Sequence, residues 1–128
     1  MNENRVIEFY KKLGLYNEEL FKYLRNNTLL VDSNQYDFYG VFTKDDGNYR
    51  MILPKISSIF DEIVWVHEYA HIILNTGEEI MPNIMESLFI NMYCDNKEDV
   101  IKRTQEEISS SVSEEHTLAK KIKLLIIK

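Results

Sequence analysis

The chain has 128 residues, of which 45% are hydrophobic and 12% are aromatic, so a folded globule is expected and not a disordered segment. This length fits one domain, residues 1–128, built around a single core. The formal net charge of −6 gives no basic surface for nucleic acid, and it disfavours an anionic membrane as a partner.

Several further features bear on the cellular location. Cys94 is the one cysteine, which excludes an internal disulfide and fits a reducing compartment. The first residues lack the basic and apolar regions of a signal peptide. No window is apolar over the roughly 18 residues that a membrane-spanning helix needs. The expectation is a cytoplasmic protein, and its oligomeric state is left open.

Two short helices are predicted at the start of the chain. Apolar residues recur at helical spacing over residues 6–13, and Gly14 is a natural stop. Asn17 can cap a second helix, which the pair Asn26-Asn27 would end.

A β-hairpin is predicted next, over residues 36–53. Segments 38–42 and 49–53 are rich in aromatic and branched side chains. The sequence Asp-Asp-Gly-Asn at 45–48 lies between them and is a strong turn signal.

The second half of the chain is predicted to be helical. One apolar helix begins near Ser57 or Ser58 and stops at 75–77, and Pro82 suits the first turn of the next helix, which runs to Tyr93. A further helix covers 98–108, and a last helix or strand follows the serine-rich break, with its lysines at the rim of the core. The fold class predicted is therefore α+β and mainly helical.

Residues 67–71 read His-Glu-Tyr-Ala-His, which is the pattern H-E-x-x-H inside an apolar helix. Two histidines four positions apart lie on the same face of a helix, one turn from each other, and can share one zinc ion. Glu68, which lies between them, can then accept a proton from zinc-bound water. The alternative interpretation is two core histidines and one surface glutamate.

A catalytic zinc has three protein ligands and leaves one position for water. Glu79 and Glu86 compete for the third position. If the two helices form an antiparallel hairpin, counting back from its tip at about 3.6 residues per turn places Glu86 level with the histidines. Glu79 lies near the tip, where Thr76-Gly77-Glu78-Glu79 fits a capping box. The geometry favours His67, His71 and Glu86 as ligands, with Glu79 as the alternative.

H-E-x-x-H followed by a glutamate on the next helix resembles the gluzincin zinc metallopeptidases. The stretch 49–93 is similar to the active-site region of the thimet-type oligopeptidases, in which the active helix follows a short strand and a loop. That resemblance implies a minimal zincin-like domain, with the hairpin before the H-E-x-x-H helix and a glutamate helix after it. It also implies that Glu79, seven residues before Glu86, is the zinc ligand.

The mechanism expected is hydrolysis of a peptide or protein, with Glu68 as general base and Zn²⁺ as cofactor. Strand 49–53 is expected to be an edge strand that pairs with an extended substrate. A donor for the oxyanion is also needed, and the candidates are His116, Tyr93, Tyr49 and Tyr39, of which His116 is expected to be a surface residue.

Two other functions remain open at this stage. One is a catalytically inactive zincin-like domain that binds or regulates another protein. The other is a peptidase dedicated to one regulatory protein.

Overall fold

The structure is a computed structural model that describes residues 3–32, 40–43 and 48–128. Over these residues the chain forms six helices and three strands: α1 Glu3–Lys12, α2 Glu18–Asn26, β1 Thr28–Val31, β2 Gly40–Thr43, β3 Tyr49–Pro54, α3 Ile59–Ile73, α4 Ile80–Tyr93, α5 Lys97–Ser110 and α6 Glu114–Ile126. The prediction of a mainly helical α+β fold is confirmed.

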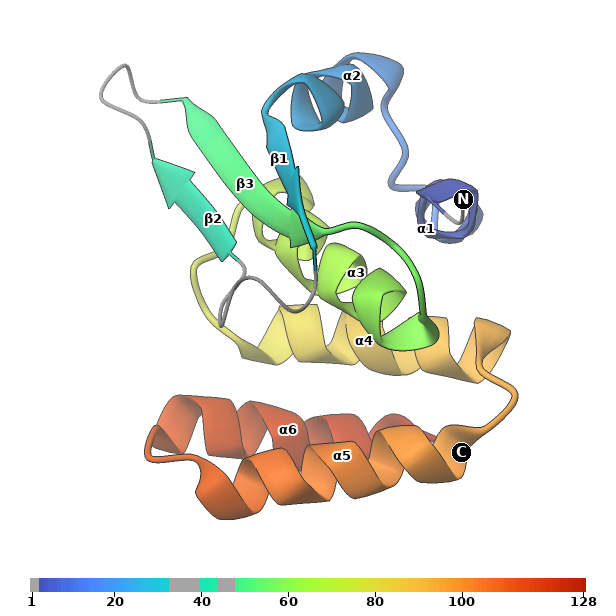
Figure 1. The fold of residues 1–128 in the computed structure, drawn as a ribbon, viewed down its shortest axis with the longest axis vertical. Helices are drawn as coiled ribbons and strands as arrows, with labels where there is room; N and C mark the ends of the chain where they lie inside the picture. The colour runs from blue at the N-terminus through green and yellow to red at the C-terminus, as the bar shows by residue number, and fades with distance from the viewer. Residues whose placement is uncertain (1–2, 33–39, 44–47) are drawn as a thin grey trace.

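The three strands form one sheet in the order β1-β3-β2 (Figure 1). Strand β2 pairs with β3 antiparallel, so that Val41 lies opposite Met51, which confirms the hairpin pairing. Residues 36–39 and 44–47 of the predicted hairpin lie outside the described residues. Strand β1, which the sequence analysis did not predict, pairs with β3 in parallel, with Leu29 opposite Ile52.

The expectation that strand 49–53 is an edge strand is wrong. Strand β3 is central, and its backbone groups are used by β1 on one side and β2 on the other. The free edges of the described sheet belong to β1 and β2, so an added strand can pair only there.

Helix α3 lies between the sheet and α4, and α5 and α6 lie beyond α4 (Figure 1). Helix α3 begins after Ser58, one of the two serines predicted to start it. Ser58 also forms a capping box with Asp61, whose carboxylate accepts a hydrogen bond from the backbone N–H of Ser58 at 3.2 Å. The helix is fixed from the sheet side, where Trp65 Nε1 donates to the carbonyl of Pro54 at 2.7 Å. It is fixed from α1 by Tyr10, whose hydroxyl donates to the carbonyl of Val66 at 2.5 Å.

The core is built on both sides of α3. Fully buried apolar side chains from α1, α2, β3, α3 and α4 form one cluster, which includes Phe9, Phe21, Leu53, Val66 and Phe89. Because this close-packed cluster holds the buried face of α3, the polar side chains on the rest of the helix are held in fixed positions.

The connection from α3 to α4 is short. Asn75 adopts a positive φ of 48°, a left-handed conformation that ends α3 at the predicted place. Apart from glycine, asparagine is one of the few residues that tolerate this conformation. Pro82 falls in the first turn of α4, as predicted. Within the described ranges, none of the helices combines the length and apolar character that crossing a bilayer requires.

Helix α6 packs against α4 and α5, and it differs from the sequence-based expectation in one respect. Lys123 was expected at the rim with the other lysines, but only 4% of it is exposed. Its ammonium group lies 2.9 Å from the carboxylate of Glu86 on α4. The cost of burying a lysine is offset here by a direct ion pair.

A second buried carboxylate fixes α1 to α3. Glu62 is 1% exposed and accepts both hydrogen bonds of a bidentate pair with Arg5. Arg5→Met should therefore lower the free energy of unfolding by about 3 kcal/mol, because a buried carboxylate is left without its partner. Denaturant unfolding at neutral pH measures the loss.

Glu8→Gln is the matched control for this substitution. It breaks an exposed pair, in which Lys12 Nζ lies 3.0 Å from Glu8 Oε1, and should cost far less than Arg5→Met because solvent screens the two charges. Equal losses in the two variants would contradict a structural role for the Arg5–Glu62 pair.

Candidate metal centre

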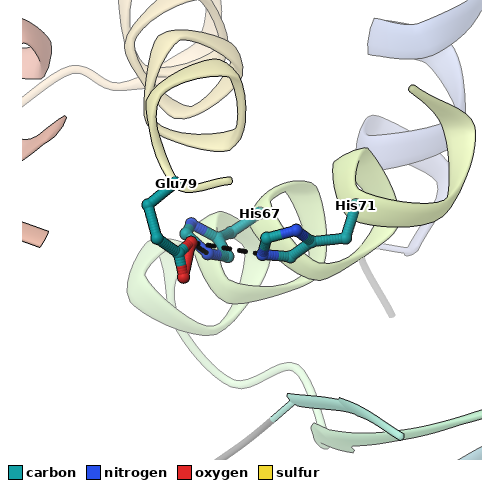
Figure 2. A group of neighbouring side chains, drawn as sticks. All are labelled: His67, His71 and Glu79. Carbon is teal, nitrogen blue, oxygen red and sulfur yellow. Dashed lines mark ion pairs between the residues drawn. The ribbon is translucent and has the colours of Figure 1, made fainter. Parts of the chain in front are cut away.

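His67 and His71 lie one turn apart on α3, and their rings face the same point (Figure 2). Glu79, at the start of α4, reaches the same point from the other side. Its Oε2 lies 3.2 Å from the Nε2 atom of each histidine. One ligand atom from each of the three residues can be chosen so that all lie within 4.8 Å of one another. The two histidines of the motif are therefore brought together as predicted.

The far nitrogen of each ring is already engaged. His71 Nδ1 lies 2.9 Å from the carbonyl oxygen of Thr76, which can only accept, so Nδ1 carries the proton of that hydrogen bond. His67 Nδ1 lies 2.6 Å from the carboxylate oxygen Oε2 of Glu86. With each Nδ1 acting as the donor, a neutral ring directs the lone pair of Nε2 toward Glu79.

The prediction that Glu86 is the third ligand differs from this arrangement. Glu86 is level with the histidines, as the helix count required, but it contacts Nδ1 at the back of the His67 ring. The atom beside both Nε2 nitrogens is Glu79 Oε2. Counting residues per helical turn gave the position of Glu86 along the helix axis correctly. That position alone does not decide which nitrogen of the His67 ring the carboxylate contacts.

The expected capping role of Glu79 is also wrong. The carboxylate of Glu78 caps α4 instead, and it accepts hydrogen bonds from the backbone N–H groups of Ile80 at 2.6 Å and Met81 at 3.0 Å. Because Glu78 takes this role, the side chain of Glu79 is available to reach the histidines.

His116 is exposed at the surface, as expected, and it also contacts the site. Its Nε2 lies 3.0 Å from Glu79 Oε1, the oxygen that faces away from the two other histidines. Sequence analysis had no signal for this contact, because it depends on how α6 packs against the beginning of α4.

One oxygen of the Glu79 carboxylate faces both imidazoles. Oε2 is buried and lies 3.2 Å from the Nε2 atom of each ring, an ion-pair distance for a protonated ring, although neither contact has hydrogen-bond geometry. When the rings are neutral, two nitrogens and one oxygen surround a common point as three potential ligand atoms. Two imidazoles and one carboxylate are also the ligand set that zinc prefers at catalytic sites, so the residues present fit a divalent cation.

The charges around the site shift the pKa values of its members. Burial acts to lower the pKa of His67, but the carboxylates of Glu79 and Glu86 outweigh it and raise that pKa to about 10. The contact with Glu79 raises the pKa of His71. Burial acts to raise the pKa of Glu79, but the two imidazoles hold that pKa well below its usual range. Without a cation, the proton on His67 offsets part of the negative charge of these carboxylates.

Glu86 stays ionised in this environment. It is buried, which acts to raise its pKa, but Lys123 and His67 lower the pKa to about 2. An ionised carboxylate that accepts from Nδ1 is the partner that metal-bound histidines commonly have in proteins, and it makes the imidazole a stronger ligand.

Glu68 lies beside the pair of histidines, as the motif predicts. Its Oε2 is 4.0 Å from His67 Nε2, and its side chain is 13% exposed. Burial raises the pKa of Glu68, while the neighbouring imidazole charges oppose that change. A carboxylate with a raised pKa is better suited to exchange protons near neutral pH than an ordinary surface glutamate.

Two cavities open next to this group. The larger, of about 590 Å³, extends from His67 and Glu68 toward α5 and α6, and His116 lines it. The smaller, of about 460 Å³, extends from His71 and Glu68 toward β2 and β3, and Tyr49 lines it. Glu68 and Glu79 line both, so the three converging ligand atoms lie where the two cavities meet.

Of the four candidates for an oxyanion donor, His116 and Tyr49 each line a cavity. Tyr93 is elsewhere: it packs against Phe89, with ring centroids 5.0 Å apart, and lines neither cavity. Tyr39 lies outside the described residues.

Comparison of the chain with protein-family models, with curated proteins and with solved structures gave no match in any of the three. The interpretation of the site therefore rests on the residues and their geometry.

Zinc binding to the metal-free protein should release about one proton per chain or more at neutral pH. The pKa of His67 is about 10, so its ring carries a proton at neutral pH that the cation replaces, and the raised pKa of His71 acts in the same direction. The apparent affinity for zinc consequently increases as the pH rises toward the pKa of His67. Calorimetric titration in buffers of different ionisation enthalpy counts the protons, and release of fewer than about 0.5 would contradict this site.

Substitution of each glutamate by glutamine distinguishes the ligand from its outer partner. Glu86→Gln should weaken zinc binding by about 10–100-fold, as is typical for the loss of a partner that orients a ligand. Glu79→Gln should weaken it more, because a ligand atom is lost. Competition with a chromophoric chelator measures both constants, and an equal or larger loss in Glu86→Gln would return the ligand role to Glu86.

Proposed function

We propose that the chain is a zinc-dependent peptidase of the gluzincin type, with His67, His71 and Glu79 as ligands and Glu68 as general base. The observation that carries this proposal is the convergence of three acceptor atoms beside an acid, at the junction of two cavities. A structural zinc site is closed by four protein ligands, whereas three ligands beside open space are typical of catalysis.

The proton transfers are assigned to Glu68. A bound zinc ion would supply Lewis acidity and lower the pKa of a coordinated water toward neutrality. Glu68 accepts a proton from the attacking water and then donates it to the nitrogen of the leaving amine. Its partly buried position and raised pKa favour both steps.

The substrate is proposed to be a peptide in an extended conformation. The outer edge of β2 has no partner strand among the described residues, and Gly40 and Val41 of this strand line the smaller cavity. A peptide that pairs with this edge passes Glu68 and continues into the larger cavity. This assigns substrate pairing to β2, in place of the strand expected from the sequence.

Tyr49 is the proposed donor to the developing oxyanion, because it lines the cavity on the β2 side. His116 lines the cavity on the α6 side, but its Nε2 atom lies 3.0 Å from Glu79 Oε1 and its Nδ1 atom lies 2.9 Å from Ser113 Oγ, so neither ring nitrogen is left for the oxyanion.

Glu68→Gln is the decisive variant for catalysis. Glutamine keeps the shape of the side chain but cannot accept the proton, so peptide hydrolysis should fall by at least about 100-fold, while zinc affinity stays close to the wild-type value. The measurements are cleavage of a broad peptide library by the zinc-loaded protein and metal content by elemental analysis.

Glu98→Gln, an exposed position on α5, is the matched control and should behave as wild type. Equal cleavage by wild type and Glu68→Gln would refute the catalytic proposal. A metal-loaded wild type that cleaves no peptide would favour the interpretation as an inactive zincin-like domain.

A further inference from the structure

Helix α6 reaches both carboxylates of the metal centre. His116 and Lys123 are seven residues apart, which is about two helical turns, so their side chains leave the same face of α6. One contacts Glu79, the carboxylate beside the Nε2 atoms, and the other contacts Glu86, the carboxylate behind His67. Neither contact belongs to the H-E-x-x-H motif or to the helix that follows it.

The contact between Lys123 and Glu86 belongs to a buried chain of three side chains. Lys123 Nζ lies 2.9 Å from Glu86 Oε1, and Glu86 Oε2 lies 2.6 Å from His67 Nδ1. The side chains of Lys123 and Glu86 are 5% and 8% exposed, so little water competes with either bond. Because each carboxylate oxygen has its own partner, the orientation of Glu86, and through it that of the His67 ring, is fixed.

The contact between His116 and Glu79 occupies one oxygen of the Glu79 carboxylate. His116 Nδ1 lies 2.9 Å from Ser113 Oγ, whose hydroxyl hydrogen is free to donate to that nitrogen. The ring proton is then on Nε2, which donates to Glu79 Oε1 at 3.0 Å. A carboxylate whose Oε1 is held in this way presents only Oε2 to the two other histidines.

The backbone of α6 is docked well enough to hold these side chains. Ser87 Oγ lies 3.2 Å from the carbonyl of Lys123, and Asn91 Nδ2 donates to the carbonyl of Ile126 at 3.0 Å. Both contacts come from α4, the helix that carries Glu86 and begins after Glu79. The carboxylates and their partners are therefore parts of one packed pair of helices.

We propose that α6 acts as a clamp on the metal centre, in which His116 and Lys123 are positioning residues. Lys123 fixes the orientation of His67 through Glu86, and His116 restricts Glu79 to binding through one oxygen, which leaves a coordination position open. This inference rests on the proposed metal centre, but it concerns how the centre is held and not whether it cleaves peptides.

Metal binding tests the clamp directly. His116→Ala should weaken Zn²⁺ binding, because Glu79 loses the partner that orients it. It should also change the visible absorption of the Co²⁺-substituted protein, because Glu79 is then free to bind through both oxygens. His116→Gln retains an N–H donor of similar reach and should restore much of the wild-type spectrum. Chelator competition gives the affinities, and a loss of about 10-fold or more is expected in His116→Ala.

Lys123 requires a paired variant, because Lys123→Met alone leaves a buried carboxylate without a partner. The double variant Lys123→Met/Glu86→Gln removes both charges and should fold, as circular dichroism can verify. Its zinc affinity should be about 10–100-fold below that of wild type. Lys121→Met, an exposed position on the same helix, is the control and should match wild type in affinity and spectrum.

Wild-type affinity and an unchanged Co²⁺ spectrum in both folded variants, His116→Ala and the double variant, would overturn the clamp while leaving the proposed peptidase intact. The reverse result, weakened metal binding in these variants together with no hydrolysis by the zinc-loaded wild type, would support the clamp and refute the peptidase. A wild-type chain that binds no metal would overturn both.

Discussion

The hydrogen bonds on the Nδ1 atoms of His67 and His71 determine what this site can do. A histidine that is free to rotate can present either nitrogen, or neither, to its neighbours. Here one ring is held by the carbonyl of Thr76 and the other by Glu86, so both Nε2 atoms point at the same place. The position of Glu79, the role proposed for Glu68 and the use of the adjoining cavities all depend on this fixed pair of rings.

The two carboxylates near the site differ in how many of their oxygens have a hydrogen-bond partner. Glu86 is buried and satisfied on both oxygens by groups of the protein, whereas Glu79 is satisfied on one oxygen and left without a hydrogen bond on the other. That second oxygen lies 3.2 Å from the Nε2 atoms of both histidines, and this arrangement supports the proposed cation site.

Much of the local structure could be predicted from the sequence, because it depends on neighbours along the chain. The helix starting after Ser58, the stop near Asn75, the proline in the first turn of α4 and the pairing of strands β2 and β3 all follow from local patterns. The two histidines of H-E-x-x-H could be placed on one face for the same reason: helical spacing fixes it.

The parts that could not be predicted depend on contacts between distant segments. Strand β1 is four residues long and carries no strong pattern of its own, and its pairing with β3 comes from packing. Choosing between Glu79 and Glu86 required the course of the loop before α4, where Glu78 takes the capping role. The contacts of Lys123 and His116 require α6 to dock on α4, and no motif in the sequence encodes that.

The order of these helices along the chain also has a consequence for synthesis. The histidines, Glu79 and Glu86 are translated before α6, so a growing chain carries the imidazoles and carboxylates before their partners Lys123 and His116 exist. Until then Glu86 lacks its ion pair with Lys123. Under the proposed metal binding, an ion captured before α6 docks meets a looser set of ligands than an ion captured afterwards.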